Sequence, residues 1–466
     1  MQTHIEQPQR PAEGQGLPER QRWLVMGCIL LGILLSNLDS AIANIALPTL
    51  VRELGTSDAA VVWVVNGYQL AVAVCLLPAA ALGEIVGHKR IYAIGLVLFL
   101  IGSVCCASAP SLSFLVAARV LQGVGGACLA ALGPALVRSI YPRSLIARGF
   151  ASIALVVAMS GALGPTVAAL ILSVAAWPWL FLVNVPACVV AIPLFLAVAP
   201  RGQGVARPFD LSGALLNAIA LGLLVLGVDI LGHDTGRAIA MLAVGAVFLM
   251  GLVWHQSRRA APLLPLDLLR IPVIALSGAT SVCSYAAQII AYISVPFLLQ
   301  TLLHRSAVET GLLVTPWPLL VAVAAPIAGR LSARYPAAVL SSVGLAVLAC
   351  GLVSLAMLPA SPGDLDIAIR MAVCGAGFGF FQTPNNTTMM TSGPVARSGA
   401  AGGLVAVART VGWCLGSSLV TMLFQLNVAD RTTKCLAVAA AFAAAGAVVS
   451  LARGLTTSGA SVPTRS

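Results

Sequence analysis

Asp39 is the residue of this sequence whose chemistry is most informative. It lies within residues 23–48, WLVMGCILLGILLSNLDSAIANIALP, a stretch that is otherwise apolar and long enough to cross a lipid bilayer. An ionisable group at that depth costs at least ~2.5 kcal/mol on insertion scales, so it usually marks a proton relay, an ion path or a ligand counter-ion. Asp39 is therefore the first candidate for a functional group.

A second ionisable residue, Arg119, lies within the apolar residues 113–137. Because an arginine keeps its charge, at membrane depth it needs a carboxylate, carbonyl oxygens or water. At 1.5 Å per residue, Asp39 lies ~13 Å from the external end of its helix, and Arg119 lies ~12 Å from the external end of its own. The matched depths predict an Asp39–Arg119 pair that could load or release a proton on small rearrangements, with a purely structural ion pair as the alternative.

Composition predicts the elements that position these residues. Hydrophobic residues make up 59% of the chain and charged residues 9%, and the mean hydropathy is +0.99, which excludes a soluble globular domain. Backbone groups in lipid must be satisfied internally, and runs of Leu, Ala, Val and Gly fit helices. We predict an all-α membrane protein with fourteen transmembrane helices, at residues 23–48, 59–82, 91–109, 113–137, 149–173, 179–199, 211–231, 237–257, 272–301, 309–329, 336–358, 367–391, 400–426 and 434–453.

The net charge of +11 reflects membrane topology rather than a nucleic-acid partner. If the N-terminus is cytoplasmic, 18 of the 26 Lys and Arg residues lie in internal segments, and five lie outside: Arg52, Arg237, Arg305, Arg431 and Lys434. This asymmetry follows the positive-inside rule. It predicts a multi-pass protein of the cell (inner) membrane with both termini cytoplasmic, in tails of residues 1–22, polar and disordered, and 455–466.

Landmarks in the two halves of the chain recur at a nearly constant spacing. The pairs are Pro78 and Pro326, Arg119 and Arg370, Pro134 and Pro384, and Gly164 and Gly416, with offsets of 248, 251, 250 and 252 residues. The spacing exceeds six helices and their loops by about two helices. We therefore predict a six-helix bundle at 23–199, an inserted two-helix hairpin with linkers at 200–271, and a second six-helix bundle at 272–454, the parallel repeat of a transporter.

Four motifs carry a resemblance to a known family. They are NLDSAIANIALP (37–48), LGEIVGHKR (82–90), RVLQGVGG (119–126) and SGALGP (160–165). Together they resemble the major facilitator superfamily, and within it the fourteen-helix drug:proton antiporters, over residues 20–453. The chain departs from the family pattern at Ala80 and Glu84, where glycine and aspartate are usual, and at Ala168 and Ala169, where glycines are usual.

The resemblance assigns roles to the motif residues. Asp39 and Arg119 are expected to couple proton movement to transport. Glu84, Gly87, Lys89 and Arg90 are expected to form a conformational latch, since a tight glycine turn beside opposite charges can hold neighbouring helices in one state and release them in the other, although the basic residues also anchor the loop to the cytoplasmic side. Gly164 and Pro165 match the antiporter motif, in which small residues allow close helix approach and proline bends the helix.

Polar and aromatic residues within the spans are candidates for the wall of a substrate cavity, because amides in lipid must face protein or water. They are Tyr68, Gln69, Tyr285, Gln288, Tyr292, Trp317, Phe381, Gln382, Asn385, Asn386 and Arg409. Gln382 and the two asparagines could instead cap the cytoplasmic end of their helix, and the tryptophans could belong to an interfacial belt. Arg370 and Arg409 have no evident acidic partner, so Arg409 could serve an anionic ligand or carbonyls. Asp229 is expected to be external.

These features predict a transporter rather than an enzyme. No phosphate-binding loop appears, the five histidines are too dispersed for a metal site, and the eleven cysteines read as packing residues, so no cofactor or metal is expected. We predict a monomeric, proton-driven antiporter that exports hydrophobic small molecules, cationic ones included, with the lipid bilayer, the substrate and protons as its partners. The alternatives are a dedicated transporter of one metabolite and a non-transporting membrane sensor or scaffold.

Overall fold

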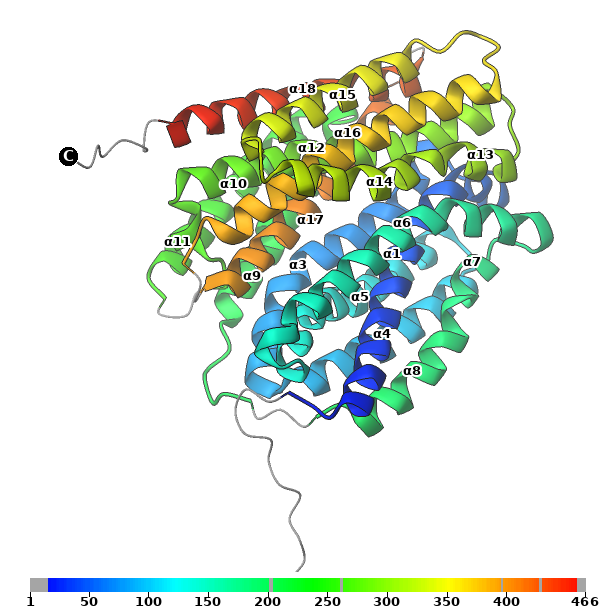
Figure 1. The fold of residues 1–466 in the computed structure, drawn as a ribbon. Coiled ribbons are helices and arrows are strands. Elements are labelled where there is room, and N and C mark those ends of the chain that lie inside the picture. The colour runs from blue at the N-terminus through cyan, green and yellow to red at the C-terminus, as the bar shows by residue number, and fades with distance from the viewer. Residues whose placement is uncertain (1–15, 201–203, 260–262, 395–396, 427–429, 459–466) are drawn as a thin grey trace, which may run out of the picture.

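The computed structural model describes residues 16–200, 204–259, 263–394, 397–426 and 430–458, and every regular element in these ranges is a helix (Figure 1). This confirms the predicted all-α class. The helices of the N-terminal half are α1 (Glu19–Leu54), α2 (Asp58–Val61), α3 (Trp63–Val86), α4 (His88–Ala107), α5 (Leu112–Ile140), α6 (Ile146–Val174), α7 (Trp179–Leu182) and α8 (Asn184–Val198), with a short η1 (Arg143–Leu145) before α6.

The rest of the chain continues the helical array. Its helices are α9 (Leu211–Asp229), η2 (Ile230–Gly232), α10 (Thr235–Ser257), α11 (Leu266–Leu269), α12 (Pro272–Phe297), η3 (Leu298–Leu302), α13 (Ala307–Val314), α14 (Pro316–Leu331), α15 (Ala337–Ala356), α16 (Asp364–Thr391), α17 (Ser398–Gln425) and α18 (Arg431–Ser458). Figure 1 shows the C-terminal half, green through yellow to red, above the N-terminal half, blue through cyan to blue-green.

The number of membrane spans is close to the prediction. In the described ranges, twelve helices are long and apolar enough to cross a membrane, or up to thirteen if the two parts of α6, bent by 41° between Arg148–Gly161 and Leu163–Val174, form one span. α16 is not among them, and its sequence carries two aspartates and an arginine in its first turns and the amides of FQTPNN further on. Fourteen spans are compatible with these helices but are not established by them.

The ends of the helices extend past the predicted spans. α1 begins at Glu19, within the predicted disordered tail, and α18 continues to Ser458, past the predicted end of the second bundle. A helix can continue beyond the lipid because water there solvates both the backbone ends and charged side chains. The remaining parts of the predicted tails, residues 1–15 and 459–466, lie outside the described residues.

The start of α1 marks one end of the molecule, where the Leu17 N–H donates to Ile140 O at 2.9 Å and Gln21 Nε2 donates to Val198 O at 2.8 Å. We call this the tail end, and the opposite end, which carries the loop after α1, the first-loop end. In the N-terminal half α1 packs on α5, α6 and α8, and α4 packs on α5. In the C-terminal half α12 packs on α17 and α18, and α15 packs on α16 and α18.

In each half, a glycine allows close contact between two neighbouring helices, at matching places in the two halves. An added Cβ at Gly125 of α5 would lie 2.5 Å from Phe99 N of α4, and one at Gly377 of α16 would lie 2.5 Å from Leu348 N of α15. No larger side chain fits at either crossing, because backbone cannot move aside as a flexible side chain does. The similar crossings are what the predicted repeat requires, and the division into two bundles stays a prediction.

The hairpin of α9 and α10 lies beside the seam between the halves. α9 packs on α10, α3 and α17, and Asn217 Nδ2 donates to Val74 O of α3 at 3.1 Å. At its tail end, Asp210 accepts hydrogen bonds from Gly213 N–H at 3.0 Å and Gln256 Nε2 at 2.8 Å, and lies 2.9 Å from His255 Nε2. Burial alone raises the pKa of Asp210, but the bonds with His255, Gly213 and Gln256 hold it well below its ordinary value.

Candidate functional site

Asp39 of α1 is enclosed within the N-terminal half, with 1% of its surface exposed. Arg119 of α5 forms an ion pair with it, Nη1 donating to Asp39 Oδ2. The other carboxylate oxygen, Oδ1, accepts hydrogen bonds from Gln122 Nε2 and from Asn184 Nδ2, both at 2.9 Å. Both oxygens of the carboxylate therefore have donors, as a charge held away from water requires.

Arg119 is held on several sides. Its Nε donates to Val64 O of α3 at 3.0 Å and its Nη1 to Gln122 Oε1 at 2.5 Å. The guanidinium also lies over the ring of Tyr68, 4.3 Å from the ring centroid, in a cation–π contact. These contacts use the planar fork of an arginine, which the ammonium of a lysine would not reproduce.

The sequence around Arg119 explains how this site forms. Arg119 and Gln122 are three residues apart on α5, so both face the same neighbours. An added Cβ at Gly123 would lie 2.6 Å from Tyr68 O of α3, and one at Gly102 of α4 would lie 2.6 Å from Gln122 Cβ. The glycines let α3 and α4 approach α5 closely enough for the polar groups to meet.

Three members of this network were not among the predicted site residues: Gln122, Asn184 and Ser103. Gln122 Nε2 donates to Ser103 Oγ at 2.9 Å, and Asn184 Nδ2 lies 3.4 Å from the same oxygen. All three side chains are fully buried. Gln122 lies inside the motif RVLQGVGG, and Asn184 is a lone amide in an apolar run, so the cost of burying an amide in lipid was the signal that could have identified them.

The predicted latch residues separate into three groups. Glu84 pairs with Arg207 of the linker before α9, with Arg207 Nη2 2.7 Å from Glu84 Oε2, rather than with its neighbours in the motif. Lys89 Nζ donates to the carbonyls of Leu196 and Ala199 at the end of α8, at 2.7 and 2.6 Å, while Arg90 is exposed. Gly87 has φ +109°, which favours glycine and makes the tight turn between α3 and α4. A latching role for these residues stays a prediction.

The antiporter-motif residues lie where α6 meets two other helices. An added Cβ at Gly164 would lie 2.3 Å from Ala41 Cβ of α1, and one at Gly311 of α13 would lie 2.5 Å from Pro165 O. Thr166 Oγ1 is 2.8 Å from Thr315 Oγ1, so α6 is also joined to the C-terminal half by a hydrogen bond. α6 thus lies between α1 and α13. Its contact residue on α1, Ala41, is two residues after Asp39 in the sequence.

Several predicted wall residues form an aromatic cluster in the C-terminal half. The ring of Tyr285 meets the rings of Phe378, Phe381 and Trp413 edge to face, with centroids 5.5, 6.5 and 5.9 Å away. Gln382 Nε2 donates to Tyr285 Oη at 3.1 Å, and Trp413 Nε1 donates to Gln288 Oε1 at 3.3 Å. Tyr292 and Trp317 make a similar edge contact at 5.2 Å.

Other predicted wall residues lie in different surroundings. Asn385 is fully buried and accepts a hydrogen bond from Arg453 Nη1 at 2.7 Å, and Arg453, the last residue of the predicted span 434–453, is 1% exposed. Gln69 is buried, and its Oε1, like Asn386 Oδ1, has no hydrogen-bond partner in the described chain. Tyr68, as described above, packs on Arg119.

One expectation about a charged residue is wrong, and a second charged residue is more buried than its place at a helix end suggests. Arg370 has an acidic partner, because its Nε lies 2.9 Å from Asp366 Oδ1 one helical turn earlier. Asp229 lies at the first-loop end of α9 but is buried, with 5% exposure, and its Oδ2 accepts a hydrogen bond from Trp63 Nε1 of α3 at 3.1 Å. α9 packs on α3 of the N-terminal half and on α17 of the C-terminal half, and this packing covers Asp229.

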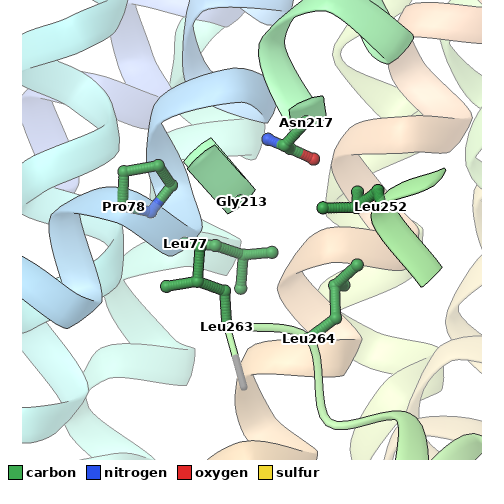
Figure 2. A pocket seen from close by; sticks show the side chains of 7 residues that line it. All are labelled: Leu77, Pro78, Gly213, Asn217, Leu252, Leu263 and Leu264. Atoms are coloured by element: carbon green, nitrogen blue, oxygen red, sulfur yellow. The ribbon is translucent and has the colours of Figure 1, made fainter. Parts of the chain in front are cut away.

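A small pocket lies away from these residues, between α3, α9 and α10, and is lined mainly by apolar side chains such as Leu77 and Leu252 (Figure 2). Its empty space of about 170 Å³ includes open solvent and leaves no room for a water molecule, whereas ligand pockets usually begin at ~300 Å³. A second pocket, with a cavity volume of about 130 Å³, lies near Phe297 and Arg431 at the first-loop end. Neither contains a predicted wall residue, so the wall assignments stay predictions.

The fold and its buried charge network are those of a polytopic membrane transporter. The chain matches the model of the Major Facilitator Superfamily over residues 29–417, and it belongs to that superfamily. It is therefore a transporter and not an enzyme, as predicted.

Relatives and solved structures agree with this membership. The chain is 45% identical to the "Uncharacterized transporter YebQ" of Escherichia coli (strain K12), over 94% of this chain and 97% of that protein. It is 28% identical to the "Riboflavin transporter RibZ" of Clostridioides difficile (strain 630), over 88% and 90%. It is 33% identical to the "Multidrug resistance protein Stp" of Mycobacterium tuberculosis, over 84% and 73%. A crystal structure of the peptide transporter POT with sulfate has the same fold, with a TM-score of 0.69 at 14% identity and 96% coverage of each chain.

Proposed function

We propose that this protein is a proton-driven antiporter of the cell (inner) membrane that exports hydrophobic small molecules, as a monomer with both termini cytoplasmic. The observation that carries the proposal is the buried network of Asp39, Arg119, Gln122 and Asn184. A titratable carboxylate that is kept at membrane depth with its charge balanced is what a proton-coupling site requires. Changing the contacts of Asp39 as the helices move would change its proton affinity and so couple protonation to the conformation.

The contacts between the two halves support alternating access. At the first-loop end, Arg431 pairs with Asp58, Asn66 Nδ2 donates to Thr421 Oγ1 at 3.0 Å, and Gln300 Nε2 donates to Ile45 O at 3.1 Å. With the tail end in the cytoplasm, this conformation is closed toward the outside. Arg119 donates a hydrogen bond to a backbone carbonyl of α3, and α3 packs on α17 of the other half. The buried network is therefore in contact with a helix that lies between the two halves.

The name of one relative supports drugs as substrates. Stp, which is 33% identical over 84% of this chain, is a multidrug resistance protein. Hydrophobic compounds, including cationic dyes and biocides, are therefore the first to test. Protonation of Asp39 from the outside and release of the proton inside would drive their export.

The test compares wild type, Asp39→Asn and, as the matched control, Asp234→Asn in everted membrane vesicles with equal amounts of protein. Asp234 is 49% exposed in the loop between α9 and α10, so its change removes a carboxylate outside the network. A panel of cationic dyes, biocides and antibiotics is added to vesicles with an acid interior. We expect substrate-induced proton release in wild type and Asp234→Asn, and none in Asp39→Asn. Full active export by Asp39→Asn, or no proton release in wild type, would falsify the proposal.

A dedicated transporter of one metabolite is the second candidate, because RibZ, a riboflavin transporter, aligns over 88% of this chain. Competition assays separate the two. A multidrug exporter is inhibited by chemically unrelated compounds, whereas a dedicated transporter is inhibited only by close analogues of its substrate.

A further inference from the structure

Arg409 is an arginine at membrane depth that the proposed proton path does not use. It lies in α17, which runs from Ser398 at the tail end to Gln425 at the first-loop end. At 1.5 Å per residue, Arg409 is ~16 Å from the first of these residues and ~24 Å from the second. Arg409 is therefore attached near the middle of the helix, too far from either end for its charged group to extend into the water there.

The guanidinium of Arg409 has no acceptor among the described residues. Its Nε is enclosed without a hydrogen-bond partner, and no ion pair or hydrogen bond to its other nitrogens is present in that part of the chain. Its one defined contact is the ring of Trp413, whose centroid is 5.2 Å away. Arg119 in the other half, in contrast, binds a carboxylate, a carbonyl and an amide.

Trp413 links Arg409 to a group of aromatic rings and amides that supplies no anion. Trp413, one turn after Arg409, donates to Gln288 of α12 and meets the ring of Tyr285 edge to face. Gln382 of α16 donates to the hydroxyl of Tyr285. These side chains come from three helices of the C-terminal half. Trp413, Gln288 and Gln382 are partly exposed and Tyr285 is buried, and Trp413 is the one in contact with Arg409.

Among the described residues, the carboxylates either have partners or lie toward the ends of the helices. In the described part of the C-terminal half, acidic residues inside the helices are confined to first turns, at Glu309, Asp364 and Asp366. Asp39 already binds Arg119 and two amides, and Asp229 lies at the last residue of α9, at the first-loop end. A cationic ligand would therefore find no open carboxylate near the middle of the seam, whereas an anionic ligand would find Arg409.

We propose that Arg409 binds the anionic group of the substrate, and that the substrate class is aromatic compounds that carry a carboxylate or a similarly delocalised anion. The planar fork of the guanidinium matches two carboxylate oxygens, and the partly exposed ring of Trp413 offers a face for the aromatic part. The inference rests on the proposed transport function and specifies its substrate, with negative charge in place of the positive charge considered above.

Equilibrium binding to the purified protein in detergent tests this site with two probes of the same shape, 2-naphthoate and its neutral analogue 2-naphthamide. The proteins are wild type, Arg409→Gln, Arg409→Lys and the control Arg370→Gln, in which the arginine lost is paired with Asp366. We expect wild type and the control to bind the acid at least about tenfold more tightly than the amide, a difference of ~1.4 kcal/mol. Arg409→Gln should lose this preference while binding the amide unchanged.

Arg409→Lys covers the case in which the glutamine variant does not fold. It keeps the charge but not the planar fork, so we expect weaker binding of 2-naphthoate and unchanged binding of 2-naphthamide. Equal affinity of wild type for the two probes, no binding of 2-naphthoate to wild type, or an unchanged preference in Arg409→Gln would each overturn the site. Because binding needs no proton gradient, these results are independent of the vesicle assay on Asp39, and either proposal can fail alone.

Discussion

Asp39 and Arg119 illustrate how a single buried charge is accommodated. Each is 1% exposed, and each would be costly in the membrane without the other. The structure adds two amides to the pair, Gln122 and Asn184, so that both carboxylate oxygens are satisfied. Removing only the arginine would leave a carboxylate with donors on one oxygen and no opposite charge.

At the residue scale, we predict that Arg119→Gln destabilises the protein by about 3–5 kcal/mol, because it leaves Asp39 buried and uncompensated. The double variant Asp39→Asn/Arg119→Gln should be more stable than Arg119→Gln alone, since it carries no buried charge at this site. Thermal unfolding in detergent measures both, with Asp39→Asn as the reference. A double variant that loses at least the sum of the two single losses would contradict the assigned pair.

At the scale of elements, α6 depends on small residues on the side that faces α1. Gly164 meets Ala41, and the motif proline carries the carbonyl that approaches Gly311 of α13. Helices in lipid associate through close packing and polar contacts rather than through the hydrophobic effect, so a glycine at a crossing contributes directly to association. α6 is also the helix that bends by 41°, which fits a proline inside it.

We predict that Gly164→Ala destabilises the protein by about 1–3 kcal/mol, because the new methyl group would overlap Ala41 Cβ. Gly161→Ala is the matched control, since the nearest atom to its added Cβ is Pro318 Cβ at 3.9 Å, an ordinary contact. The melting temperatures of the two variants in the same detergent decide the matter. If both melt like wild type, the close approach of α1 and α6 does not hold in the membrane protein.

At the scale of the whole molecule, the two halves are joined at the first-loop end by polar contacts. Asp58 begins α2 in the N-terminal half, and its partner Arg431 begins α18 in the C-terminal half. Arg431 also lies over the ring of Phe424, 5.3 Å from its centroid. The pair is only partly buried, with 15% of Asp58 and 43% of Arg431 exposed, so it can break and reform as the halves move.

We predict that Asp58→Asn opens the first-loop end more often, because it removes one of the few charged links between the halves. Spin labels at Ser57→Cys and Thr432→Cys, in a background without the native cysteines, would report a shift of the distance distribution to longer values. The swapped pair Asp58→Arg/Arg431→Asp should restore the shorter distances. Unchanged distances in Asp58→Asn would show that the neutral contacts alone keep this end closed.

The sequence predicts what depends on the solvent and on local spacing. Runs of apolar residues must be helical in lipid because their backbone groups have no other partners, and this was enough to predict the class and nearly all of the helices. The depth of Asp39 and Arg119 follows from counting residues along two such helices. The ion pair of Arg370 with Asp366 was also within reach, since the residues are one helical turn apart, but it was missed.

The tertiary structure alone decided which distant side chains meet. Gln122 and Asn184 lie 83 and 145 residues from Asp39, Arg207 lies 123 residues from Glu84, and Asp229 became buried by packing against Trp63. Each of these contacts depends on how helices rotate about their axes and cross. That is set by glycines and polar groups on several helices at once, so no local pattern contains it. Hydropathy therefore determined that this chain is a helical membrane protein, and packing determined which of its charges are satisfied and that Arg409 Nε has no hydrogen-bond partner among the described residues.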